Sequence, residues 1–247
     1  MADPLQPLLE LAGVADSVGA ARAAVDALLN HRTLRRRSAD VSAESALRGA
    51  WASAALAGAR YELDDVRSGA ARALRDPVLQ GALRSQAEIA SLTETWNRAP
   101  RQALARLHVL AAADLLADRS ALGRPTAGSA ARLDTLTATL TATSAPAVIV
   151  AALVQAEILS LDAFAPASGV VARAAARLTL IDRGLDPRSL VVIEVGHREQ
   201  AGEMIEALAA YRRGDAEGVG QWIRHCAAAV IAGAQESIAI CESLGRR

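Results

Sequence analysis

The chain has 247 residues and a formal net charge of zero, with 27 acidic residues and 27 basic residues that are all arginine. Hydrophobic residues make up 52% of the chain but aromatic residues only 2%, so a core of one large domain must be built from alanine, leucine, valine and isoleucine. The absence of lysine excludes a Walker-type phosphate loop, a kinase ATP lysine and a pyridoxal phosphate Schiff base. The zero net charge argues against a broad nucleic-acid-binding surface.

Helical spacing of apolar residues runs through most of the chain and predicts an all-α, multi-helix protein. Ser42 is a candidate cap for a helix at 43–60, and Pro77 and Pro100 suit the first position of a helix. The only β-like run is at 190–195, between Pro187 and Gly196. Other helical segments are expected at 5–12, 15–31, 64–75, 100–118, 130–142, 146–161, 169–184, 198–212 and 216–243.

The domain organisation expected from this pattern is an N-terminal helical extension at 1–40 and a helical core at 41–247. The most loop-like stretch, at 119–129, is a connection within the core. Cys226 and Cys241 fall on one expected helix about four turns apart, so they are interpreted as reduced. The start of the chain lacks the pattern of a signal peptide, and the longest apolar run is too short to cross a bilayer. We therefore expect a cytoplasmic protein without a membrane partner.

The most informative stretch runs from Asp162 to Arg173 and reads DAFAPASGVVAR. It contains Phe164, the only phenylalanine of the chain, followed by a turn of small residues and the start of a helix. It resembles the signature loop of Fic-domain proteins, His-x-Phe-x-Asp/Glu-Gly-Asn-Gly-Arg-x-x-Arg. Proteins of that family transfer a nucleotide monophosphate to a protein hydroxyl. The resemblance extends over roughly residues 45–240 and implies a Fic-like helical bundle.

Aligned on this signature, the chain keeps Phe164, Gly169 and Arg173 but changes other positions. Asp162 stands in place of the family's catalytic histidine and Ser168 in place of its asparagine. Three further positions also differ: Pro166 replaces the metal-binding acid, Ala167 the first glycine and Val170 the first arginine. The resemblance therefore implies a degenerate member of the family.

A second family motif, the inhibitory helix Ser/Thr-x-x-x-Glu-Gly/Asn, is also altered. Ser53 and Gly58 match it, whereas Ala57 stands in place of the glutamate. In the family this glutamate pairs with the arginine at the position of Arg173. We therefore expect Arg173 to have no partner on the helix that carries Ser53.

These replacements remove most of the groups that the transfer reaction needs. A carboxylate such as Asp162 is a weaker base than an imidazole at neutral pH. Proline has no side-chain oxygen for a metal, and valine cannot hydrogen-bond a phosphate. We expect no catalytic residue, no metal site and no bound cofactor, with ATP and magnesium left as an open alternative.

An anion site remains an alternative at the turn formed by Ser168, Gly169 and Arg173. Backbone amides at a helix N-terminus attract a negative group, and Arg173 lies one turn further on. The structural alternatives are that Ser168 is a plain helix cap, that Arg173 bonds carbonyls or a carboxylate, and that Asp162 caps a turn.

Two other groups of residues carry weaker signals. The histidines His31, His108, His197 and His225 show no metal-binding spacing. His108 is expected to be a core or interface histidine. The basic run at 32–37 is interpreted as a solvated helix end favoured by a C-terminal helix dipole. The alternatives are contact with an acidic partner or with nucleic acid, and nucleic-acid binding is unlikely.

Three functional hypotheses follow. The first is a catalytically degenerate Fic-like protein that acts by protein binding or regulation, through an unidentified protein partner and as a possible homodimer. The second is a nucleotide-binding sensor without turnover. The third is an atypical nucleotidyltransferase centred on Asp162.

Overall fold

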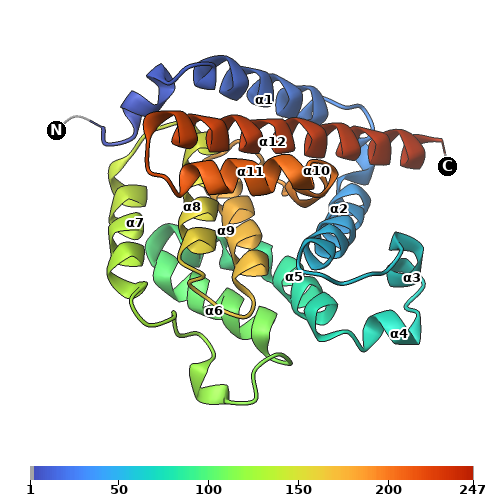
Figure 1. The fold of residues 1–247 in the computed structure, drawn as a ribbon. Coiled ribbons are helices and arrows are strands. Elements are labelled where there is room, and N and C mark those ends of the chain that lie inside the picture. The colour runs from blue at the N-terminus through green and yellow to red at the C-terminus, as the bar shows by residue number, and fades with distance from the viewer. Residues whose placement is uncertain (1–2, 247) are drawn as a thin grey trace.

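The computed structural model describes residues 3–246, and within them twelve α-helices and two short 3₁₀ segments are connected by short loops (Figure 1). The chain starts with a 3₁₀ segment at Gln6–Glu10 and has a second one at Arg119–Ala121. The helices are α1 (Val14–Leu29), α2 (Leu34–Leu56), α3 (Leu63–Arg67), α4 (Ala71–Leu74), α5 (Pro77–Arg98), α6 (Pro100–Ala112), α7 (Ala130–Ala142), α8 (Ala147–Ser160), α9 (Ser168–Asp182), α10 (Ile193–Glu199), α11 (Ala201–Tyr211) and α12 (Ala216–Gly245). The all-α prediction is confirmed.

The core consists of two apolar clusters that share the central helix α9. The first cluster is built mainly from α1, α8, α10 and α12, with Ala176 and Leu180 contributed by α9. The second is built from α2, α5, α6 and α7, with Val171 and Leu178 contributed by α9. Most of α9 is buried because its alanines let the neighbouring helices approach closely. The helix thus carries its polar side chains, Arg173 and Arg177, into the interior between the two clusters.

The longest helix, α12, is by length and composition long and apolar enough to span a membrane. In the structure it lies along α1, and it also packs against α8, α10 and α11 (Figure 1). Its apolar face, including Trp222, Ile223 and Ile240, is part of the first cluster. This packing is the kind found for a core helix, which passes the same length and composition test.

The proline positions predict helix starts well, whereas other boundaries differ from expectation. Pro77 and Pro100 each open a helix as predicted. The helix expected to start at residue 43, after Ser42, begins nine residues earlier, at Leu34, so Ser42 lies inside α2 and does not cap it. The segment expected at 64–75 is divided between α3 and α4, and that at 198–212 between α10 and α11.

No strand is present at 190–195, or elsewhere in the described residues. Leu190 and Val191 donate their amides to the carboxylate of Asp186, at 2.9 and 2.8 Å, and Ser237 donates to the carbonyl of Leu190. α10 begins directly afterwards, at Ile193. The apolar composition of this run therefore reflects complete burial of an irregular segment rather than pairing in a sheet.

The division expected between residues 40 and 41 falls inside α2, which runs from Leu34 to Leu56 with a kink at Arg37. The extension itself docks on the core, because Val14, Val25 and Leu28 of α1 are fully buried in the first cluster. Residues 1–2 and 247, the outer ends of the two expected segments, lie outside the described residues.

Candidate functional site

The candidate site is the turn between α8 and α9, which connects two packed helices. Asp162 leaves α8 with a left-handed backbone conformation, at φ 45°. Phe164 turns inward, is 2% exposed and lies against His108, with ring centroids 5.3 Å apart. Its amide donates to the hydroxyl of Ser168, 2.9 Å away. Ser168 therefore holds the turn closed by accepting an amide hydrogen within it.

The other signature positions divide between the surface and the core. Asp162 and Pro166 are exposed, whereas Val170 is buried in the second cluster with Ala167. The loop before α7 covers one side of the turn, where Thr126 donates from its amide and hydroxyl to the carbonyls of Ala163 and Asp162. The exposed rim of the turn thus presents one carboxylate and a proline ring.

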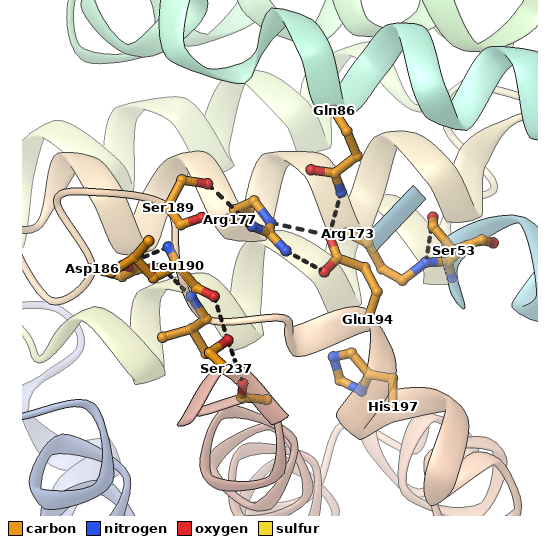
Figure 2. Close-up of polar contacts among 12 residues, drawn as sticks. Ser53, Gln86, Arg173, Arg177, Asp186, Ser189, Leu190, Glu194, His197 and Ser237 are labelled. Carbon is orange, nitrogen blue, oxygen red and sulfur yellow. Dashed lines mark hydrogen bonds and ion pairs between the residues drawn. The ribbon is translucent and has the colours of Figure 1, made fainter. Parts of the chain in front are cut away.

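Arg173 does not face the outside of the turn. Its side chain is 2% exposed and points to α2, where Nε donates to Oγ of Ser53 at 2.9 Å and Nη2 donates to the carbonyl of Ser53 at 2.8 Å (Figure 2). The expectation that Arg173 lacks a partner on this helix is therefore wrong. Ser53 itself accepts two hydrogen bonds from the guanidinium. Burial lowers the pKa of Arg173 to about 10.

The remaining positions of the inhibitory motif lie where α2 ends. Ala57 is the C-terminal cap of the helix, and Gly58 follows with a positive φ of 100°. Ala57 borders a small cavity of about 40 Å³ above the start of α9. The residues that line it are apolar or lack a side chain, and include Val78, Ala111, Pro166, Gly169 and Val170.

These residues do not fit a nucleotide with its magnesium ion. The lining of the cavity has no charged side chain, and its volume of about 40 Å³ is far below the range of ligand pockets. The guanidinium of Arg173, which lies beside Gly169 of this lining, already bonds Ser53. Among residues 3–246, no group of three or more His, Cys, Asp or Glu side chains could hold a metal. We therefore derive no reaction step through a nucleotide or a metal.

A buried polar layer lies directly behind the turn and was missed by the sequence analysis. Arg177, one turn after Arg173, forms an ion pair of 2.7 Å with Glu194 of α10, and both side chains are almost completely buried (Figure 2). Gln86 of α5 also donates to Glu194, and Arg177 donates to Ser189. A signal for this pair existed in the sequence, since Glu194 is the only charged residue of an apolar run and would need a partner when buried.

Space for this layer is left by Gly49 of α2. A methyl group at this position would lie 2.9 Å from Nη2 of Arg177, 3.1 Å from Oε2 of Glu194 and 3.2 Å from Nε2 of Gln86. These distances are shorter than ordinary van der Waals contacts. The layer thus joins α2, α5, α9 and α10 and fixes the helix that carries Arg173.

A second buried group links His197 with His225. His197 Nε2 donates to Oε1 of Gln155 at 3.1 Å, so its Nδ1 accepts from Nε2 of His225 at 3.0 Å. Burial lowers the pKa of His225 to about 4 and the pKa of His197 as well. Both rings are therefore neutral at physiological pH. Nothing in the spacing of the two histidines along the chain predicted their contact.

The fold is similar to that of a solved structure, the crystal structure of a Fic family protein from Desulfovibrio desulfuricans G20. The two structures superpose with a TM-score of 0.74 and 17% sequence identity, over 91% of this chain and 74% of the other. No protein-family model matches the sequence. No curated protein matches it either. The protein therefore has a Fic-like fold, as the signature predicted. Because the sequence identity is low, the structural similarity shows the fold alone.

Proposed function

We propose that the protein is a catalytically degenerate Fic-like protein that acts by binding or regulating a protein partner. The observation that carries this proposal is the contact of Arg173 with Ser53. The one signature arginine that remains is buried, and two of its donor groups are used inside the protein. It is therefore not available to a phosphate group while α2 keeps its place.

The composition of the turn supports the same proposal. A phosphoryl-transfer site needs groups that neutralise charge in the transition state and a base that orients the nucleophile. Here the exposed rim offers Asp162 and Pro166, and the adjacent cavity is small and apolar. What is preserved is the inward-facing part, with Phe164 in the core and Ser168 closing the turn. The residues that pack the turn against the bundle are therefore present, whereas groups that would bind a nucleotide or act as a base are replaced.

The test is incubation of the protein with labelled ATP, magnesium and a cell lysate, together with calorimetry using ATP and ADP. We expect no transferred label and no heat of nucleotide binding. The control is the double variant Asp162→His, Pro166→Glu, in which two exposed positions regain the signature residues without disturbing the core. Magnesium-dependent heat in this variant alone would show that the assay detects a restored site.

The two alternative functions give distinct results in the same experiment. Nucleotide heat without label would support a sensor, and label that disappears in Asp162→Ala would support an atypical transferase. Either result would overturn the proposal. We further propose that the protein acts in the cytoplasm. Light scattering after gel filtration would test whether it does so as a homodimer.

A further inference from the structure

A group of exposed arginines lies at the start of α2. Arg32, Arg35 and Arg36 are all exposed, and no ion pair to any of them is formed within residues 3–246. They lie close together because residues three and four positions apart share one face of a helical turn. The neighbouring Arg37 differs from them, since it pairs with Asp40 and donates to the carbonyl of Leu244.

The end of α12 brings a fourth arginine to this surface. A methyl group on Gly245 would lie 3.1 Å from Oγ1 of Thr33, so the end of α12 lies against the start of α2. Arg246, the next residue, is exposed. Figure 1 shows the end of α1, the start of α2 and the end of α12 at the same side of the molecule. We call the surface of Arg32, Arg35, Arg36 and Arg246 the arginine patch.

The guanidinium groups of the patch lie close to one another without an acidic neighbour. Arg35 and Arg36 lie in a turn that the kink at Arg37 separates from the rest of α2, and this turn contains no acidic residue. The C-terminal ends of α1 and α12 lie beside it, so the C-terminal helix dipole expected from the sequence acts here, but a dipole offsets only a fraction of a full charge. Like charges on one helical turn repel one another. Among residues 3–246 no ion pair compensates Arg32, Arg35 or Arg36, and such a local conflict is typical of a functional surface.

We propose that the arginine patch is the docking surface for an acidic segment of a protein partner, rich in aspartate or glutamate. This inference rests on the proposed function, because it names the chemistry of the partner that the protein would bind. Guanidinium groups bind carboxylates through paired hydrogen bonds, and several arginines on one face select a run of acidic side chains. A nucleic acid fits less well, since the chain has no net positive charge and the patch offers few phosphate contacts.

The experiment measures fluorescence anisotropy of a labelled hexaglutamate peptide added to the full chain. We expect binding at low salt that is lost at about 0.5 M salt, where charges are screened within a few ångströms. The uncharged hexaglutamine peptide should not bind. The triple variant Arg32→Gln, Arg35→Gln, Arg36→Gln should weaken binding at least about tenfold.

A matched control replaces three exposed arginines elsewhere, Arg60→Gln, Arg75→Gln and Arg188→Gln, which removes the same net charge. We expect this variant to bind the peptide as the unchanged protein does. Equal weakening in both triple variants would show that only net charge matters and would overturn the proposal. The same follows if a short DNA duplex binds the patch more tightly than the peptide does.

The melting temperature of the patch variant provides a second readout. Because its arginines repel one another, their removal should leave thermal stability unchanged or raised. A lowered melting temperature would indicate a structural role instead. The labelling assay of the proposed function is independent of these results. If the peptide does not bind and no nucleotide is transferred, the docking proposal is overturned and the proposed function is not.

Discussion

The two buried arginines of α9 lie one helical turn apart and have different surroundings. Arg177 has a carboxylate partner, Glu194, and a shell of further donors and acceptors around it. Arg173 bonds a serine hydroxyl and a carbonyl, and no carboxylate of residues 3–246 is in contact with it. A buried charge is costly unless it is paired. The comparison indicates that Arg177 holds the fold together, whereas Arg173 is a signature residue that the fold has enclosed.

The largest effect is expected when one member of the ion pair is removed. Arg177→Met leaves the carboxylate of Glu194 buried without its main partner and should lower the free energy of unfolding by about 3–5 kcal/mol. Arg173→Met removes a charge that has no carboxylate partner, and we expect a change within about 1.5 kcal/mol, of either sign. Urea unfolding of both variants measures the difference. Equal losses would contradict the distinction between the two arginines.

A smaller effect is expected from filling the space beside the Arg177 side chain. Gly49→Ala places a methyl group 2.9 Å from Nη2 of Arg177 and should cost about 1–3 kcal/mol through overpacking. Gly19→Ala in α1 is the matched control, because a methyl group there meets nothing within 4 Å. The control should raise stability by up to about 1 kcal/mol, as expected for alanine in an exposed helix. The sign difference between the two variants can be read from their melting temperatures.

The smallest effect concerns the pH dependence of stability. In the unfolded chain histidine titrates at about 6.5, whereas burial lowers the pKa of folded His225 to about 4. The unfolded state therefore binds more protons between these values, and the free energy of unfolding should fall as the pH drops from about 6.5 to about 4. Urea unfolding at several pH values should show a shallower fall in His225→Gln.

An unchanged pH dependence in that variant would mean that other groups carry the titration. The nearest one is His197, whose pKa is lowered by burial and by His225, whereas the charge of Glu203 raises the pKa of His225. Asp186 is a separate case, because burial raises the pKa of its carboxyl. A raised carboxyl pKa stabilises the folded state toward acid, so this residue partly offsets the histidines at the low end of the range.

The local features of the fold could be predicted from the sequence. Proline at a first helical position and apolar residues at helical spacing depend only on neighbours along the chain, so the starts of α5 and α6 and the general helical order were correct. The prediction at 190–195 failed for a tertiary reason. Leu190 and Val191 are held by Asp186, a contact that replaces the expected strand pairing.

The sequence by itself determined that the chain is helical, that it contains the Fic-like turn around Phe164, and that Asp162, Pro166 and Val170 stand where the Fic signature has other residues. These properties reside in residue types and short spacings. The tertiary structure alone decided that Arg173 bonds Ser53, that Arg177 meets Glu194, and that the arginines of α2 lie beside the end of α12. Such contacts join residues far apart in the chain, and they form only when the two apolar clusters have packed around α9.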